Sequence, residues 1–215
     1  MLQVSQSMNS QRAPPNTRLG FAALFQDGAP NIFCERGSTV FRGGDKAEYL
    51  YKVLTGATFT CKILYDGSRH ISSFYFPGDC FGLEASNIHA LSAEAICDVT
   101  LSRVTGAAAQ SDPTAAADLL QWGMAELSRA NQHLIMLSQS ADARVAVFLL
   151  EMNEHLGVKS QIELPTNRLI ADYLGLTLET VSRTLTRLTK KSLIQKVASR
   201  RVGLTNVAGL KSLAD

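Results

Sequence analysis

The stretch Ile170-Ala-Asp-Tyr-Leu-Gly-Leu-Thr-Leu-Glu-Thr-Val-Ser-Arg-Thr-Leu-Thr-Arg-Leu188 decides the fold of the C-terminal part of this chain. We expect two short helices joined by a tight turn at Gly175, which is the pattern of a helix-turn-helix. In the second helix, apolar residues recur at i, i+3, i+7 and i+10 and form a stripe that must pack against other elements. The stripe consists of Leu178, Val181, Leu185 and Leu188.

Three polar side chains of the second helix share another face. Glu179, Ser182 and Arg183 are spaced i, i+3 and i+4, so they project together from its first turns. Arginine can donate two hydrogen bonds to guanine, glutamate can accept one from cytosine N4, and serine suits either kind of edge. Leu178 is a candidate for contact with a thymine methyl group, although core packing is the stronger expectation for it. The pattern predicts a helix that reads DNA bases.

Two ordinary structural interpretations compete with base reading. Glu179 and Arg183 could form a simple i,i+4 salt bridge, and the two helices could be an ordinary αα-hairpin. The charge of the segment favours DNA, because residues 180–201 contain seven Lys or Arg and no Asp or Glu. Each phosphate that a cation neutralises releases counterions, which drives association. The candidate phosphate contacts are Thr166, Arg168, Thr177, Arg187, Lys190, Lys191, Arg200 and Arg201.

Charge is distributed unevenly along the 215 residues. The whole chain has a formal net charge of +2, but residues 139–215 contain eleven basic and seven acidic residues, and the remainder contains ten and twelve. This asymmetry predicts a basic C-terminal binding module on a near-neutral N-terminal module. No apolar run reaches the roughly 18 residues that span a bilayer, and residues 1–18 lack the hydrophobic core of a signal peptide. We therefore expect a cytoplasmic protein with no membrane partner.

Short apolar runs separated by glycine fill the region from about residue 21 to residue 104. Residues 49–56, 58–67 and 70–78 alternate as strands do, and many short strands at this spacing predict a β-barrel or β-roll. The four cysteines are widely spaced and form no C-x-x-C pair, so we expect buried or half-buried thiols instead of a zinc ribbon or a disulfide framework. They are Cys34, Cys61, Cys80 and Cys97.

A long helix is expected between the two modules. Ser111-Asp-Pro-Thr114 offers a helix start, and helix-forming residues follow from Ala115. A 4-3-4-3-4 spacing then gives the seam of a short coiled coil, in which Asn131 is the kind of polar residue that fixes register and partner number. Packing of the helix on its own β-module would give a similar pattern, but two-fold readers of palindromic DNA favour a homodimer. The seam contains Leu120, Met124, Leu127, Asn131, Leu134 and Ser138.

The C-terminal module is expected to be a winged helix. A further helix begins near Ala141 and ends near Gly157, and the segments 193–197 and 201–204 can pair as a hairpin whose tip carries basic residues. The expected organisation is a flexible tail (1–18), a β-roll (19–110), a dimerisation helix (111–138) and a winged helix-turn-helix (139–215).

Several of these motifs resemble the CRP/FNR superfamily of bacterial transcription regulators, and within it the FixK branch. Residues 37–45 and 50–56 resemble the opening of the family's β-roll, and residues 76–84 resemble its P-G-D-x-x-G turn. Glu179-Thr-Val-Ser-Arg183 is similar to the E-x-x-S-R signature of FNR-type recognition helices, which implies TTGAT-like half-sites. The resemblance implies an α+β fold: an N-terminal β-roll like the cyclic-nucleotide-binding jelly roll, a long dimerisation helix and a C-terminal winged helix-turn-helix.

Two departures from the family limit what this member is expected to bind. A CRP-like cyclic-nucleotide site uses an Arg-Ser/Thr pair after the Gly-Glu turn, and residues 89–95 contain no arginine to hold the phosphate beside Glu84. An FNR-type [4Fe-4S] cluster needs clustered thiolates near the N-terminus, but no cysteine precedes Cys34. Cys97 resembles the fourth ligand and is expected in the core of the roll. We expect no cofactor and no metal. His70 and His89 leave a haem ligand open, without a supporting pattern.

The resemblance implies a homodimeric, sequence-specific regulator, mainly an activator, that works with RNA polymerase on genes of low-oxygen or nitrogen-oxide metabolism. The alternative is a ligand- or redox-gated sensor regulator whose β-roll binds a small effector or haem. A third reading, an enzyme or scaffold built on a β-roll, is remote, because the chain has no G-x-G-x-x-G, P-loop, nucleophile elbow or H-E-x-x-H motif.

Overall fold

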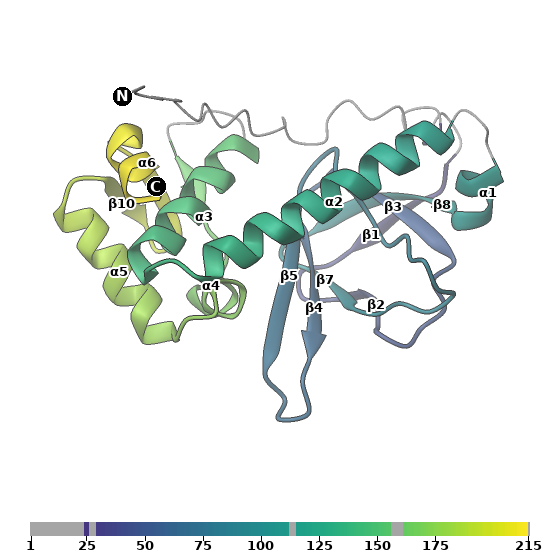
Figure 1. Ribbon diagram of the computed structural model, residues 1–215, viewed down its shortest axis with the longest axis horizontal. Coiled ribbons are helices and arrows are strands. Elements are labelled where there is room, and N and C mark those ends of the chain that lie inside the picture. The colour runs from purple at the N-terminus through teal and green to yellow at the C-terminus, as the bar shows by residue number, and fades with distance from the viewer. Residues whose placement is uncertain (1–23, 26–28, 112–114, 156–160, 215) are drawn as a thin grey trace, which may run out of the picture.

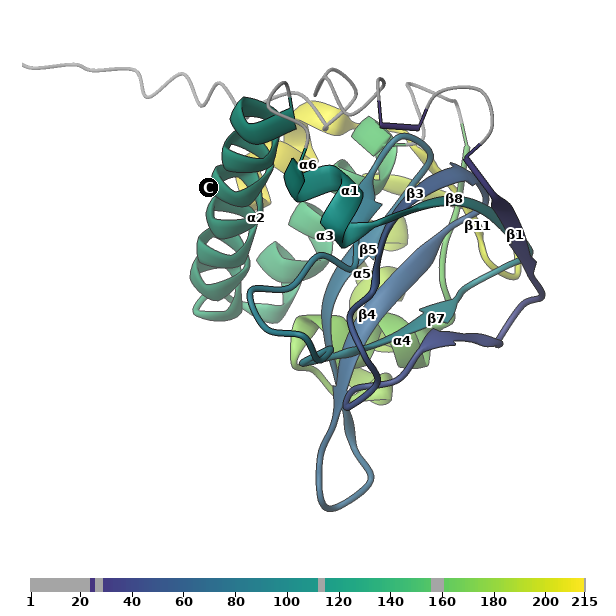
Figure 2. The ribbon, with the colours of Figure 1, turned by 90° about the vertical axis from the view of Figure 1, so that its right-hand side faces the viewer.

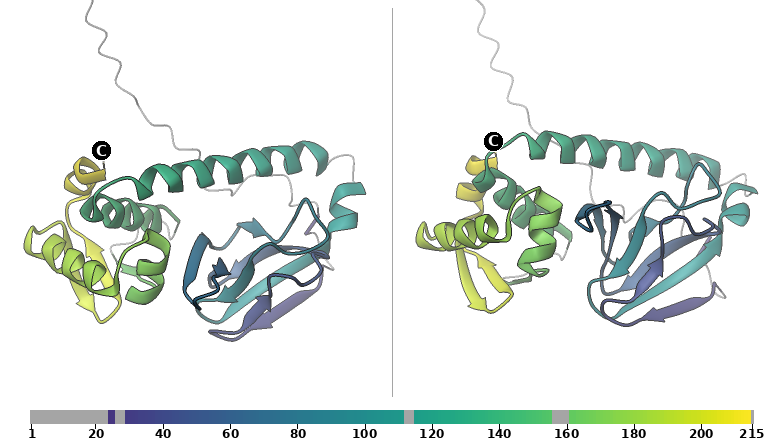
Figure 3. Two further views of the ribbon diagram at one scale, coloured as in Figure 1. Left: turned by 60° about the horizontal axis from the view of Figure 1, so that its bottom comes forward. Right: turned by 90° about the horizontal axis from the view of Figure 1, so that it is seen from below.

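The computed structural model describes residues 24–25, 29–111, 115–155 and 161–214. A β-lobe and a mainly helical lobe lie side by side, and the long helix α2 (Ala115–Leu137) runs across both of them (Figures 1 and 3). The expected α+β class, with a β-roll, a long helix and a winged helix-turn-helix, is confirmed. The expected tail at 1–18 lies outside the described residues.

The β-roll consists of two four-stranded antiparallel sheets that face each other. The strand orders are β1-β8-β3-β6 and β2-β7-β4-β5. Aromatic and aliphatic side chains fill the space between them, including Phe41, Tyr51 and Phe81. The β4–β5 hairpin projects away from the body of the roll (Figure 2). The strands are β1 (Asn31–Cys34), β2 (Thr39–Phe41), β3 (Tyr49–Thr55), β4 (Thr58–Ile63), β5 (Arg69–Tyr75), β6 (Cys80–Phe81), β7 (Ser92–Ala95) and β8 (Val99–Thr105).

Helix α2 has two different long faces. One face lies on the roll, where Trp122 donates its indole N–H to the Cys80 carbonyl at 3.3 Å and Met136 is buried. The other face carries large exposed apolar side chains, two of which, Leu127 and Leu134, also border the cavity between the helix and the roll. Leu120, Met124, Leu127, Leu134 and Ile135 are 59–70% exposed. A short helix that we had not expected, α1 (Gly106–Ser111), precedes α2.

The second lobe is built on α3 (Ala141–His155), whose middle part is buried. Around it lie α4 (Asn167–Leu174), α5 (Leu178–Lys190), the hairpin β10 (Ile194–Ala198) and β11 (Arg201–Leu204), and α6 (Val207–Ala214). The hairpin forms at the expected place. An additional strand, β9 (Ile162–Glu163), pairs with β11, and its two residues are too few for sequence alternation to show.

One apolar core is shared by the two lobes. Phe59, Ile71 and Phe74 from the roll belong to the same buried cluster as Phe148 of α3 and Tyr173 of α4. The Phe74 and Tyr173 rings lie edge to face with their centroids 4.9 Å apart. Contacts of this kind fix the position of the second lobe against the roll. None of the helices among the described residues is long and apolar enough to cross a bilayer.

Two expectations about single residues were wrong. Leu178 was expected to pack in the core, but it is 50% exposed, because the buried face of α5 is formed by Val181, Thr184 and Leu188. Cys97 was expected in the core of the roll, but it is exposed, because it lies in the turn between β7 and β8.

Candidate nucleic-acid interface

The helix-turn-helix owes its geometry to two threonine caps and one glycine. The Thr166 hydroxyl accepts a hydrogen bond from the Leu169 amide at the start of α4, and the Thr177 hydroxyl accepts one from the Thr180 amide at the start of α5. Gly175 ends α4 with φ of 60°, a left-handed conformation that favours glycine. Both threonines therefore position the helices, whatever they contact in addition.

A half-buried arginine that the sequence did not single out supports this turn. Arg144 of α3 donates from Nη1 to the Leu174 carbonyl at 2.9 Å and from Nε to the Gln139 carbonyl at 2.9 Å. It thus bonds a carbonyl group at the end of α4 and another in the loop between α2 and α3. No local pattern marks Arg144 in the sequence, because its partners lie 30 residues away and in the preceding loop.

The expected base-reading residues form one exposed surface on the first two turns of α5. Glu179 and Arg183 form an ion pair, and their side chains are 69% and 73% exposed. Ser182 is exposed beside them, and so is Leu178 at the first position of the helix. The salt bridge proposed as the ordinary interpretation is therefore present, but such an exposed pair is worth only about 0.3–0.5 kcal/mol and can open for another partner.

The opposite side of α5 is held by α3. Val181 and Leu188 are fully buried, and the Thr184 hydroxyl donates to the Asp142 carboxylate at 3.4 Å. Arg187 also pairs with Asp142, at 3.0 Å. Sequence spacing did not predict the buried role of Thr184, since a threonine among exposed threonines carries no signal of its own. These contacts leave only one edge of α5 available to a partner.

The six cations among the candidate phosphate contacts divide into two groups. Three are already ion-paired: Arg187 with Asp142, Arg168 with Asp172 at 3.1 Å, and Arg200 with Glu163 at 3.5 Å. Lys190, Lys191 and Arg201 are exposed and have no carboxylate within 4 Å in the described part of the chain. In the first group, Arg168 lies at the start of α4, Arg200 in the wing turn and Arg187 in the last turn of α5. The residues of the second group lie at the end of α5 and on β11.

The roll has a cavity of about 580 Å³ between its strands and α2. Glu84, which the resemblance to CRP-like β-rolls associates with a cyclic-nucleotide site, lies in its lining. Its lining includes the carboxylates of Glu84 and Glu126 and the imidazoles of His70 and His133, but no lysine or arginine. A cyclic phosphate needs a cationic partner, so the residues present do not fit it.

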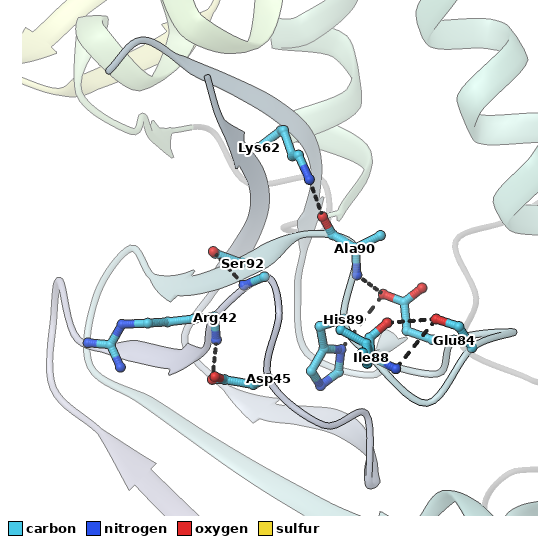
Figure 4. A network of polar contacts seen from close by, with 10 residues as sticks. Arg42, Asp45, Lys62, Glu84, Ile88, His89, Ala90 and Ser92 are labelled. Atoms are coloured by element: carbon cyan, nitrogen blue, oxygen red, sulfur yellow. Dashed lines mark hydrogen bonds and ion pairs between the residues drawn. The ribbon is translucent and has the colours of Figure 1, made fainter. Parts of the chain in front are cut away.

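Hydrogen bonds within the protein hold the loop after Glu84, so its polar groups are not free for a ligand (Figure 4). The Glu84 carboxylate accepts a hydrogen bond from the Ala90 amide at 3.2 Å and lies 3.7 Å from Nδ1 of His89. Lys62 donates to the Ala90 carbonyl at 3.0 Å. His89 is buried and stacked on the Phe41 ring at 3.6 Å, and burial lowers the pKa of its imidazole. This packing leaves His89 badly placed to bind haem iron.

The thiols do not form a ligand set. Cys34, Cys61, Cys80 and Cys97 are all free, and among the described residues no three metal-binding side chains gather at one place. Burial raises the pKa of the Cys80 thiol to about 12 and also raises that of Cys61. Both are therefore poor nucleophiles and poor ligands at neutral pH.

Comparison with known proteins agrees with this arrangement. Residues 32–111 match the cyclic nucleotide-binding domain family, and residues 143–213 match the Crp-like helix-turn-helix domain family. The chain is 40% identical to the nitrogen fixation regulation protein FixK of Azorhizobium caulinodans over 197 residues, which cover 86% of this chain and 79% of that protein. It is 38% identical to FixK of Rhizobium meliloti over 181 residues, covering 83% of this chain and 84% of that protein.

A solved structure gives the same result. FixK2 from Bradyrhizobium japonicum is 38% identical and superposes with a TM-score of 0.84, covering 87% of this chain and 98% of that one. Two domain types matched in the expected order, together with a relative 40% identical over most of its length, show that the chain belongs to the CRP/FNR family of DNA-binding transcription regulators.

Proposed function

We propose that this protein is a sequence-specific transcription activator that binds TTGAT-like palindromes. The observation that carries the proposal is the exposed surface of Leu178, Glu179, Ser182 and Arg183 on α5. A guanidinium, a carboxylate and a hydroxyl there match the donor and acceptor edges of the major groove. Since Leu178 is exposed and not packed, it supplies an apolar contact for a thymine methyl group.

The active form is a homodimer joined along α2. The outer face of α2 exposes Leu120, Met124, Leu127 and Leu134, and Asn131 is exposed among them. An isolated soluble chain rarely leaves such a continuous apolar stripe in water. A second copy of the same helix covers it with the same residues, and the resulting two-fold axis suits a palindromic site. Lys190, Lys191, Arg200, Arg201 and the other candidate cations then contact the phosphates of each half-site.

Activity requires no cyclic nucleotide, iron–sulfur cluster or other cofactor. The arginine-free loop after Glu84 and the separate thiols support this part of the proposal. The protein acts in the cytoplasm together with RNA polymerase. The FixK relatives are named for regulation of nitrogen fixation, and the target genes proposed here are those of low-oxygen or nitrogen-oxide metabolism.

The test is a gel shift with purified, ligand-free protein on a TTGAT-N4-ATCAA duplex. We expect a single shifted band whose formation is abolished when the guanine of each half-site is replaced. A duplex with the half-sites scrambled is the matched control. Equal binding to both duplexes contradicts sequence-specific recognition.

A gated sensor is the second candidate, because the cavity beside α2 contains unpaired polar atoms. Both ring nitrogens of His133 are buried and have no hydrogen-bond partner among the described residues. A small uncharged effector, or haem, is the alternative occupant. If the ligand-free protein does not shift the duplex but does so after addition of a small-molecule cell extract, this second function replaces the first.

A further inference from the structure

The carboxylate of Asp142, in the first turn of α3, bonds two side chains of α5 at once. Its Oδ2 accepts a hydrogen bond from Nη1 of Arg187 at 3.0 Å, and its Oδ1 accepts one from the Thr184 hydroxyl at 3.4 Å. Thr184 is fully buried, and the Asp142 side chain is only 18% exposed. The carboxylate is therefore held beside α5 by a bond that does not involve Arg187.

Arg187 lies at the edge of the base-reading surface. It follows Arg183 by four positions and Thr184 by three, so it lies between the exposed face of α5 and the face packed on α3. Its side chain is 51% exposed, which leaves the guanidinium room to turn outward. A phosphate oxygen and a carboxylate oxygen are both anionic acceptors that suit arginine. Asp142 and a DNA backbone beside α5 therefore compete for the same cation.

The other cations at the end of α5 have no such competitor. Lys190 and Lys191 are exposed, and within the described ranges no carboxylate lies within 4 Å of either ammonium group. Any DNA can bind these two lysines without breaking an ion pair. To bind Arg187, it must first displace Asp142.

We propose that Asp142 is a specificity-determining residue, because it keeps Arg187 from DNA of the wrong sequence. The proposal rests on the proposed function, since it needs base reading by α5. On the correct site, Glu179 and Arg183 hold α5 in the groove, and the backbone phosphate then lies near enough to Arg187 to displace Asp142. Non-specific binding consists almost wholly of phosphate contacts, so α5 is not seated there and Arg187 stays with Asp142. The carboxylate thus lowers non-specific affinity more than specific affinity.

The test uses Asp142→Asn, which removes the charge but keeps an oxygen that can accept from Thr184. Fluorescence anisotropy of the full chain is measured against salt on the TTGAT-N4-ATCAA duplex and on the scrambled duplex. On the scrambled duplex, the variant should bind at least about tenfold more tightly at about 0.1 M salt, with a salt slope steeper by roughly 1.8 units, which is two phosphates per dimer. On the specific duplex the gain should be smaller, so the ratio of the two affinities falls.

Three further proteins show whether the effect passes through Arg187. Asp142→Glu restores the carboxylate and should behave as wild type. Glu154→Gln removes the same charge from an exposed position about 18 Å along α3 and is the matched control, which should change neither affinity. In an Arg187→Gln background, Asp142→Asn should have no effect, because the cation for which it competes is gone. A thermal melt of each variant checks that it is folded.

Four outcomes overturn the proposal, and each has a distinct reading. Weaker binding of Asp142→Asn to both duplexes would mean that Asp142 orients Arg187 for DNA. An unchanged affinity for the scrambled duplex, or an equal gain on both duplexes, removes the role in specificity. An effect that persists in the Arg187→Gln background assigns it to another partner. Equal binding of the wild-type protein to both duplexes removes the proposed function itself, and this is read before any variant is made.

Discussion

The loop after Glu84 in the roll and the first turns of α5 carry similar polar side chains, but the two regions present them in opposite ways. In the roll, Glu84 and Lys62 both bond to the backbone of Ala90, and His89 is stacked under Phe41. On α5, Glu179 and Arg183 bond only weakly to each other and stay exposed. Residue type alone therefore does not make a binding site, because the partners already present in the free protein decide what remains available.

The largest expected effect concerns the proposed homodimer, which brings two copies of α5 to the DNA. Leu127→Glu puts a charge into the apolar seam of α2, so the protein should become monomeric. Its affinity for the palindrome should fall at least about a hundredfold, because a monomer engages only one half-site. Light scattering and anisotropy measure the two quantities. Gln132→Glu, exposed on the flank of the same helix, is the control and should remain dimeric. A dimeric Leu127→Glu protein contradicts the proposed seam.

The exposed residues of α5 are tested next. Arg183→Ala should cost about 1–3 kcal/mol of specific binding and should flatten discrimination at the guanine, because its bidentate contact is lost. Competition with single-base variants of the site measures this. Lys196→Ala removes a positive charge from the wing strand β10 and should weaken binding without changing the base preference. If Arg183→Ala keeps the guanine preference, Arg183 does not read that base.

The cations at the end of α5 should contribute affinity without specificity. Lys190→Gln and Lys191→Gln should each weaken binding to all sequences alike and reduce the salt slope by about one unit per chain. Arg187→Gln should change the slope less, because Asp142 already neutralises Arg187 in the free protein. Salt titrations on specific and scrambled duplexes separate these cases. A change of base preference without a change of slope would remove the lysines from the phosphate group.

Acid should lower the stability of the folded protein through its buried histidines. Burial lowers the pKa of His89, His133 and His155, so these imidazoles stay neutral in the folded chain where the unfolded chain takes up protons. The free energy of unfolding should therefore decrease as the pH falls below about 6.5, and it should level off between about pH 7 and 8. Denaturant melts across this range measure the decrease. His133→Gln should reduce it; an unchanged pH profile in that variant would assign the dependence to the other two histidines.

The smallest expected effect is that of cyclic AMP, which should leave the melting temperature unchanged. Millimolar cyclic AMP should not raise the melting temperature, because a ligand stabilises a protein only by binding the folded state, and the cavity beside α2 has no cation for the phosphate. Differential scanning fluorimetry is sufficient to measure this. A rise that saturates with concentration would mean that the roll opens to a nucleotide after all.

The sequence allowed prediction of the features that repeat along one element. The apolar stripe of α5, the outer seam of α2 and the hairpin after Lys191 all come from local spacing, and the helices and strands form at those places. The features it missed depend on contacts between distant segments. Asp142 of α3 bonds Thr184 and Arg187, and Arg144 bonds the carbonyl at the end of α4. Arg36 of the roll and Arg168 of α4 line the same hollow although 132 positions separate them in the chain. Leu178 and Cys97 were misplaced for the same reason, since hydrophobicity alone does not show where an element ends.

The shared core of Phe59, Phe74, Phe148 and Tyr173 has a consequence for how the molecule unfolds. Separating the lobes exposes these side chains to water, and each buried aromatic side chain contributes about 1.5–3 kcal/mol, so neither lobe gains from loosening on its own. Heat should therefore disrupt both lobes in one cooperative step, seen as a single calorimetric peak. The two parts of the chain that match separate domain families would then unfold together.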